Sequence, residues 1–228
     1  MRPITKTAIA ALLVTAAPIA ASAQNVAIAY GLSFSTEYVS QGFELSDGAS
    51  LGAYVEAATS GAYAGVYTQT GDPDLLGAST EFGAYIGYGN TIGSFSYDIN
   101  YNYYWYDDSD DDFTEIIATG TYALTDAIYA SLSYGKYLTT YEQSSISATV
   151  DYYTDYPGLT ISGTYGQVET DFGEGGGAIY DYSYWSVGGS YTVSDNVTID
   201  LTYYDADDDG QGLGVTEGIA VVSVMIDF

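Results

Sequence analysis

The chain has 228 residues and a formal net charge of −27, because 30 acidic residues stand against 3 basic ones. A protein this acidic repels nucleic acid and attracts cations, so we expect no nucleic-acid partner. It contains neither Cys nor His, which excludes disulfides, thiolate chemistry and the Ser-His-Asp and Cys-His arrangements of nucleophilic enzymes; we therefore expect no enzymatic activity and no tightly held cofactor.

Residues 1–23 have the pattern of a signal peptide for export. Arg2 and Lys6 form a positive start, and Ala8–Ala21 is an apolar stretch too short for a membrane-spanning helix. Ala21-Ser22-Ala23 is a small-residue cleavage site before Gln24. Cleavage there leaves residues 24–228, which we interpret as one domain.

The stretch Ser94–Tyr106 indicates the fold class. Its large apolar residues, from Phe95 to Trp105, recur at every second position, and serine, asparagine and aspartate lie between them. This period of two predicts a β-strand. A strand with one aromatic face, one polar face and no basic residue is typical of a transmembrane antiparallel β-barrel, whose outer face meets lipid. We therefore predict an all-β barrel in the outer membrane.

The same alternation recurs along the chain and predicts twelve strands. The predicted strands are Val26–Val39, Leu51–Ala58, Ala62–Thr70, Glu81–Gly89, Ser94–Tyr106, Thr114–Leu124, Ile128–Leu138, Ile146–Thr154, Leu159–Thr170, Ser183–Val193, Val197–Asp205 and Glu217–Phe228. An even number of strands returns both ends of the chain to the same, periplasmic side of the membrane.

The connections alternate between short turns and longer, acidic loops. The turns are Thr59–Gly61, Asn90–Gly93, Thr125–Ala127, Asp155–Gly158 and Ser194–Asn196, and the loops are Ser40–Ser50, Gly71–Thr80, Asp107–Phe113, Thr139–Ser145, Asp171–Tyr182 and Ala206–Thr216. Outer-membrane barrels have short periplasmic turns and long extracellular loops, so we expect the loops to lie outside the cell. Whether Asp171–Tyr182 folds inward decides whether the lumen is open or plugged.

The chain ends with AVVSVMIDF, in which Val222, Val224 and Ile226 are in phase with the terminal Phe228. This pattern is similar to the C-terminal signal that outer-membrane barrels present to the barrel assembly machinery. We expect the chain to bind that machinery and then the lipid of the outer membrane.

The segment Ser35–Asp47, STEYVSQGFELSD, runs from a Thr-Glu-Tyr strand end into a Gly-Phe-x-x-Ser-Asp loop. Together with Gly61–Thr70 and the tyrosine-rich Tyr97–Tyr106, it resembles the TorF family of porins, and the resemblance covers essentially residues 24–228. The resemblance implies a small barrel that is named a porin by analogy and has no catalytic residues. The chain departs from the family at Gln41, where many members carry Arg, and in Asp107–Phe113, where some carry Cys.

If the bulky residues of each strand face outward, nine acidic side chains point into the lumen. They are Glu37, Glu56, Glu81, Asp98, Glu115, Asp151, Asp200, Glu217 and Asp227. The same phase places Tyr104 and Tyr106 inward and Lys136 outward. A negative lumen predicts passive, cation-preferring diffusion of small cationic or neutral solutes. The alternative is a plugged structural or adhesive barrel whose acidic loops bind divalent cations. In a filled lumen the inward acids would hydrogen-bond to Ser, Thr and Tyr.

Two acidic loops offer oxygen ligands for a metal ion. Asp205, Asp207 and Asp209 precede a glycine with the spacing of a calcium loop, although the acid expected at its twelfth position falls one place late, at Glu217. Asp107–Phe113 is denser in aspartate but lacks the glycine. One hypothesis is weak calcium binding outside the cell, and the other is a solvated run of charge that reflects a saline habitat.

Overall fold

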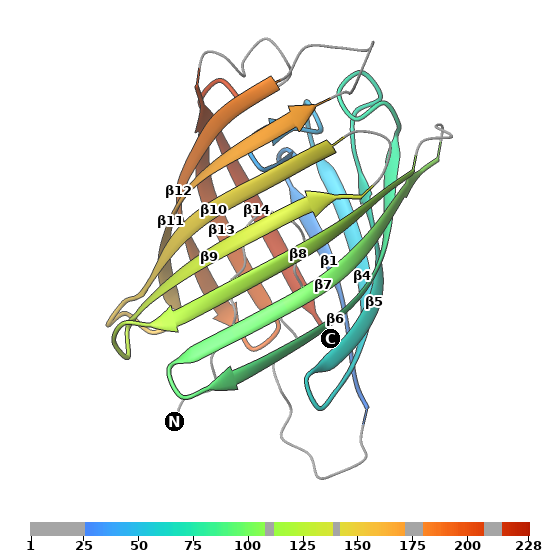
Figure 1. The fold of residues 1–228 in the computed structure, drawn as a ribbon. Coiled ribbons are helices and arrows are strands. Elements are labelled where there is room, and N and C mark those ends of the chain that lie inside the picture. Colours follow the sequence, from blue (N-terminus) through green and yellow to red (C-terminus); the bar gives the residue numbers. More distant parts are fainter. Residues whose placement is uncertain (1–25, 108–111, 139–141, 172–179, 208–215) are drawn as a thin grey trace.

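The computed structural model describes residues 26–107, 112–138, 142–171, 180–207 and 216–228. Twelve strands form a closed barrel, in which each strand pairs antiparallel with the next and the first pairs with the last (Figure 1). These strands are β1 (Ala27–Ser35), β4 (Ser50–Thr59), β5 (Ala62–Thr70), β6 (Thr80–Ile92), β7 (Phe95–Tyr106), β8 (Asp112–Ala123), β9 (Ile128–Tyr137), β10 (Glu142–Tyr153), β11 (Leu159–Asp171), β12 (Tyr180–Ser194), β13 (Val197–Ala206) and β14 (Ile219–Asp227). The predicted all-β barrel and its strand number are confirmed. The predicted signal peptide, residues 1–23, lies outside the described residues.

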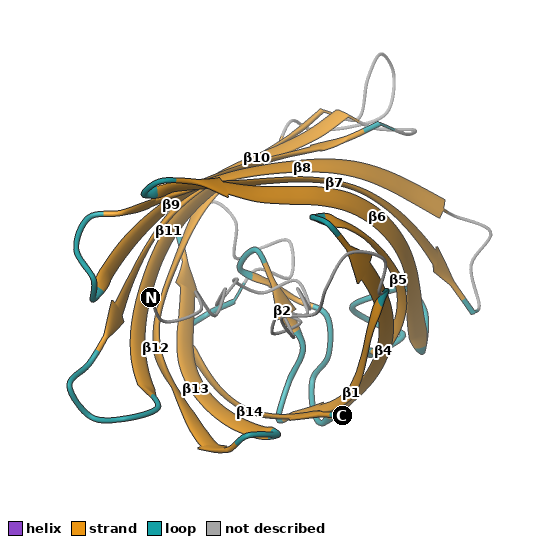
Figure 2. Ribbon diagram, turned by 90° about the horizontal axis from the view of Figure 1, so that it is seen from below, coloured by secondary structure: helices purple, strands orange, loops and turns teal. Residues whose placement is uncertain are grey.

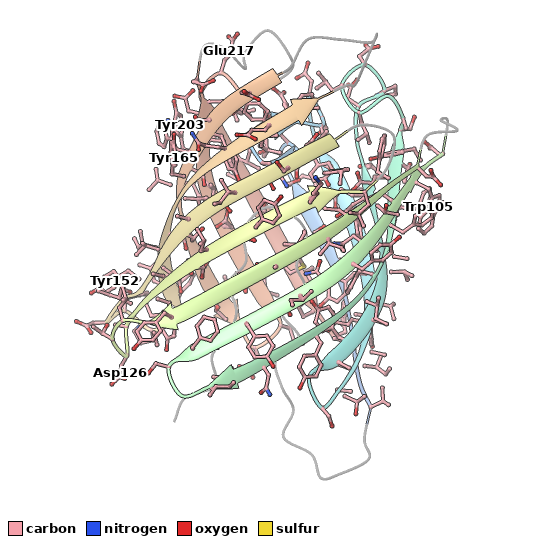
Figure 3. All side chains as sticks on the ribbon, viewed as in Figure 1. Trp105, Asp126, Tyr152, Tyr165, Tyr203 and Glu217 are labelled. Carbon is pink, nitrogen blue, oxygen red and sulfur yellow. The ribbon has the colours of Figure 1, made fainter. Side chains whose placement is uncertain are left out.

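The outer surface is apolar because the alternation of the strands points aliphatic side chains and many aromatic rings outward. Ile86 is 61% exposed and Leu132 is 57% exposed, which suits a face covered by lipid. Aromatic rings gather near both ends of the barrel: Trp105 stacks with Phe82 and with Tyr103, with 5.6 Å between ring centroids in each pair. Figure 3 shows Trp105, Tyr165 and Tyr203 on the outside of the upper half and Tyr152 near the lower turns. Such rings form the interfacial girdles of a membrane barrel.

The short turns lie at the lower end of the barrel, together with the C-terminus, as predicted (Figure 1). The turn between β4 and β5 has Ser60 and Gly61 at φ 50° and 89°, the left-handed conformation that a two-residue hairpin turn requires. Several strand ends differ from the prediction. Strand β6 runs to Ile92 instead of Gly89, β10 begins at Glu142 instead of Ile146, and β12 begins at Tyr180 instead of Ser183, because pairing continues through the polar residues there. No helix in the described residues is long and apolar enough to span a membrane.

A second, small sheet lies inside the barrel. Its two strands are β2 (Val39–Ser40) and β3 (Phe43–Glu44), joined by a turn at Gln41 and Gly42, with φ 51° and 77°. Figure 2 shows β2 within the ring of barrel strands. This hairpin corrects two predictions: the first strand ends at Ser35 instead of Val39, and the Ser40–Ser50 loop does not stay outside the barrel. The alternation of Glu37, Tyr38 and Val39 mimics a continuing strand, which is why the sequence did not indicate the bend.

Candidate functional site

The lumen is lined on one side by tyrosines that lie flat across glycines. On β4, β5 and β6, three tyrosines face a glycine directly across the strand pair: Tyr54 faces Gly31, Tyr63 faces Gly87, and Tyr85 faces Gly65. A Cβ atom placed on each glycine would lie 2.3 to 2.6 Å from the ring that covers it. Because glycine has no side chain, each ring can lie against the wall instead of projecting into the bore.

The phenol group of each of these tyrosines donates a hydrogen bond to an acid one strand further around the barrel. The Oη atom of Tyr54 donates to Asp227 at 2.6 Å, that of Tyr63 to Asp98 at 2.7 Å, and that of Tyr85 to Glu56 at 3.0 Å. The same three-strand arrangement therefore occurs three times: a tyrosine, a glycine on the next strand, and a carboxylate on the strand beyond it. Asn100 also donates to Asp98, at 3.0 Å. We call the inner faces of β14, β1 and β4 to β7 the phenol–carboxylate wall.

The facing side of the lumen carries small hydroxyls. Directly paired residues of neighbouring strands share hydrogen bonds, at 2.8 Å between Thr119 and Ser133, 2.9 Å between Thr121 and Ser131, and 3.1 Å between Thr149 and Thr164. Two acids belong to this side, Glu115 on β8 and Asp151 on β10, and Asp151 accepts a hydrogen bond from Ser162 at 2.5 Å. We call the inner faces of β8 to β11 the hydroxyl wall.

At the upper end of the lumen, three phenols converge on Glu81. Tyr38 and Tyr67 donate to its Oε1 atom at 3.1 and 2.8 Å, and Tyr106 donates to its Oε2 atom at 3.1 Å. Hydrogen bonds to an ionised acceptor are stronger than neutral ones, so this cluster fixes three rings around one carboxylate. Tyr38 precedes β2, and its bond to Glu81 therefore ties the hairpin to β6.

The tip of the hairpin is held by β12 and by the segment before β14. The Oη atom of Tyr182 donates to the carbonyl oxygen of Gln41 at 3.1 Å, and the amide of Thr216 donates to the carbonyl oxygen of Gly42 at 2.8 Å. Gly42 lies so close to Tyr184 that a Cβ atom on it would be 2.5 Å from the tyrosine Cβ. Phe43 packs against a buried cluster of Val168, Tyr182, Tyr184 and Ala206. The hairpin is thus attached to opposite sides of the lumen.

Three acids of the hairpin region lie close enough to repel one another. Burial raises the pKa of Glu37, and the negative charges of Glu44 and Asp47 raise it further. Burial and the charge of Asp47 also raise the pKa of Glu44. The Oε2 atom of Glu37 is buried and has no hydrogen-bond partner among the described residues. Charge on this segment therefore opposes its compact arrangement.

Residues 19–223 match the family described as "Bacterial protein of unknown function (Gcw_chp)". The chain belongs to this family. The match supports the predicted membership of a bacterial family of unknown function, but it does not carry the TorF name. No curated protein is similar enough in sequence to count as a match.

Solved structures with a similar fold include two porins. The "KdgM porin" is 14% identical with a TM-score of 0.62, and the comparison covers 88% of this chain and 99% of that one. The "NanC porin" is 9% identical with a TM-score of 0.58, covering 88% of this chain and 98% of that one. At these identities the likeness shows the fold alone. A closed barrel with an apolar exterior, in a bacterial family, is the architecture of outer-membrane proteins, which agrees with the predicted location.

Seven of the nine predicted lumen acids lie on the inner face of a barrel strand. They are Glu56, Glu81, Asp98, Glu115, Asp151, Asp200 and Asp227. Glu37 instead lies in the segment that enters the barrel, between β1 and β2. The inward placement of Glu217 was wrong: β14 begins at Ile219, and Glu217 is exposed at the upper rim (Figure 3). Gly218, at φ 77°, interrupts the strand pattern there.

The predicted calcium ligands are only partly within the described residues, because Asp209 lies outside them. The Oδ1 atom of Asp205 accepts a hydrogen bond from its neighbouring amide at 2.9 Å, and the Oδ2 atom of Asp207 accepts one from the amide of Ser183 at 2.8 Å. Among the described residues, no group of three or more acids is arranged to hold a metal ion. Calcium binding by this loop stays a prediction.

The sequence reasoning missed the inward tyrosines paired with glycines. Tyr104 and Tyr106 were predicted to face inward, and both do, but Tyr54, Tyr63 and Tyr85 were not singled out. The sequence did contain a signal: Gly65 and Gly87 fall on the inward-facing positions of their strands, where a glycine contributes no polar side chain to the lining of the lumen. Recognising their partners, however, requires the register between strands.

Proposed function

We propose that this protein is an outer-membrane channel for the passive diffusion of small solutes, with a preference for cations, and that the hairpin of β2 and β3 narrows its outer end. The observation that carries the proposal is the polar lining of a closed barrel by carboxylates, phenols and hydroxyls. A barrel that served only as a membrane anchor would gain nothing from keeping carboxylates inside, where each must be hydrogen-bonded at a cost.

The preference for cations follows from the balance of charge. The only basic side chain in the described part of the chain is that of Lys136, which lies on the outward phase of β9, beside Ile116 and Ser144. Seven inward acids, Glu56, Glu81, Asp98, Glu115, Asp151, Asp200 and Asp227, therefore have no inward base to offset them. Fixed negative charge in a low-dielectric wall concentrates cations and excludes anions.

A second function is favoured by the hairpin itself. Its bonds to β6 through Tyr38 and to β12 through Gln41 cross the lumen, and a segment held at both sides can close a barrel as well as narrow it. In that case the protein is a plugged structural or adhesive barrel.

Single-channel recording in planar bilayers distinguishes the two functions. The parent barrel is compared with a variant in which residues 39–44 are replaced by a Gly-Ser linker of the same length. A narrowed channel should give small steps in the parent and larger steps in the variant. A plugged barrel would give no steps in the parent, and the absence of steps in both proteins would exclude a channel.

Reversal potentials in a salt gradient test the preference for cations. We expect a cation preference that grows as the salt is diluted, because the Debye length lengthens beyond its value of about 10 Å at 0.1 M. Changing Glu37, Glu81 and Glu115 together to Gln should weaken it, whereas Asp126→Asn, in an exposed lower turn, should have much less effect (Figure 3). An anion-selective parent, or a triple variant with the parent's selectivity, would contradict the proposal.

A further inference from the structure

Only one of the two carboxylate oxygens of Glu115 has a hydrogen-bond partner among the described residues. It lies on β8 and is 2% exposed. Its Oε2 atom accepts a hydrogen bond from Tyr104 at 3.0 Å, whereas its Oε1 atom is buried and has no partner among the described residues. A buried carboxylate oxygen without a donor or a cation costs several kcal/mol in the general case, so such atoms are rare in folded proteins.

Two further polar side chains, those of Gln41 and Ser145, lie next to Glu115. The side chain of Gln41, at the hairpin tip, hydrogen-bonds to Glu115, and its own Oε1 atom is also buried without a partner among the described residues. The Oγ atom of Ser145 and the Oε1 atom of Glu115 flank Gly135, at 2.8 and 2.6 Å from the place where its Cβ would be. Glycine at this position leaves the space between the two oxygens free.

The described part of the chain has no basic side chain to place there. Its basic residues number three, and only Lys136 lies in the described part, on the outward phase of β9. A hydroxyl can donate to only one of the two unpaired oxygens at a time. Two buried, unpaired oxygens on side chains that are hydrogen-bonded to each other are satisfied together most simply by a cation that both can coordinate.

We propose that Glu115, Gln41 and Ser145 form a binding site for a single hard metal cation, with calcium as the preferred ion. Carboxylate, amide and hydroxyl oxygens are the ligands of calcium, which accepts irregular geometry and completes its shell with water, whereas magnesium demands near-octahedral ligands. Because Gln41 is at the hairpin tip and Glu115 on β8, a bound ion would fasten the hairpin to the hydroxyl wall. The site is separate from the predicted Asp205–Asp209 loop, and it does not depend on whether the lumen conducts.

Thermal unfolding of the protein in detergent micelles tests the site, with calcium raised from zero to about 10 mM, the range for extracellular oxygen sites, at constant ionic strength. We expect the melting temperature of the parent to rise with calcium, because a ligand that binds only the folded state stabilises it. Glu115→Gln and Gln41→Leu should each remove the rise. Gln41→Lys should also remove it while keeping the calcium-free stability, since the ammonium replaces the ion.

The matched control is Asp151→Asn. Asp151 is another buried lumen acid, but it accepts a hydrogen bond from Ser162 and neither of its oxygens is both buried and unpaired among the described residues, so the calcium response should persist. A response that persists in Glu115→Gln and in Gln41→Leu would overturn the proposal. Loss of the calcium response in Asp207→Asn would also overturn it, because the ion would then belong to the Asp205–Asp209 loop. An equal response to sodium or magnesium would overturn it too, because it would indicate screening of charge instead of a calcium site. No calcium effect in the parent would overturn it as well.

Discussion

The phenol–carboxylate wall and the hydroxyl wall are built from strands with the same alternation, and yet their chemistry differs. On the first wall, long side chains lie along the surface, and each ties together three strands. On the second, the small hydroxyls share hydrogen bonds with directly paired residues, as Thr119 does with Ser133. The tyrosine hydrogen bonds of the phenol–carboxylate wall thus connect strands that are not direct neighbours, whereas each hydroxyl pair of the hydroxyl wall connects two neighbouring strands.

Glycine explains the difference. Wherever a lumen tyrosine reaches an acid across a strand, that strand contributes a glycine: Gly31, Gly65 or Gly87. The paired hydroxyls of the hydroxyl wall need no such gap because their side chains are short. A fourth example, outside the first wall, supports this reading: Tyr184 covers Gly166, and its phenol hydrogen-bonds to Ser147 one strand beyond. There a serine replaces the acid, so the arrangement depends on the glycine more than on the charge.

The largest effect should come from filling one of these gaps. In Gly87→Ala, the new Cβ would lie 2.3 Å from the Cζ atom of Tyr63, so the ring must leave the wall and lose its bond to Asp98. Overpacking of this kind costs about 1 to 3 kcal/mol of unfolding free energy. We expect lower stability in urea and, if the lumen conducts, smaller single-channel steps, because the displaced ring enters the bore.

Gly163→Ala is the matched control for that variant. Gly163 is also in a strand interior, but the nearest heavy atom to its added Cβ is 3.9 Å away, so the substitution should change neither stability nor conductance appreciably. If both variants behave alike, backbone propensity rather than the covering ring would explain the loss, and the difference drawn between the walls would fail.

The sequence predicts much of this architecture because a strand's alternation is local. Residues such as Phe95 and Trp105 identify β7 without any knowledge of its neighbours. The pairing of Tyr63 with Gly87 is not local, since it follows from the register of β5 against β6. The position of the hairpin was missed for a related reason. Its turn at Gln41 and Gly42 is local, but its attachment to β12 depends on Tyr182, which is 141 residues away from Gln41 in the sequence.

An effect of intermediate size is expected from pH, through the hairpin. The hairpin is attached to the phenol–carboxylate wall by the hydrogen bond from Tyr38 to Glu81. Burial and mutual repulsion raise the pKa values of Glu37 and Glu44 in the folded protein. Protonation of these groups therefore stabilises the docked hairpin; this contribution is fully present below the ordinary glutamate pKa and is lost as the pH rises through the raised values. We expect conductance to increase as the pH rises above the ordinary glutamate pKa, because the hairpin is then held less firmly.

The double variant Glu37→Gln with Glu44→Gln separates this effect from titration of the walls. It removes the carboxyls of Glu37 and Glu44, whose pKa values are raised, while leaving the acids of the barrel strands in place. Its conductance should vary less with pH than that of the parent. Equal pH dependence in the two proteins would assign the titration to the lumen acids and not to the hairpin.

The smallest effect is expected on the hydroxyl wall, where Thr149 and Thr164 share a buried hydrogen bond of 3.1 Å. Thr149→Val leaves the hydroxyl of Thr164 without its partner and should cost about 1 kcal/mol of unfolding free energy. Changing both residues to Val removes donor and acceptor together, so the double variant should be about as stable as the parent. Urea unfolding of the two single variants and the double variant gives this cycle directly. If the double variant loses as much stability as the sum of the singles, the pair contributes more than its own bond, and the hydroxyl wall is coupled across several strands as the phenol–carboxylate wall is.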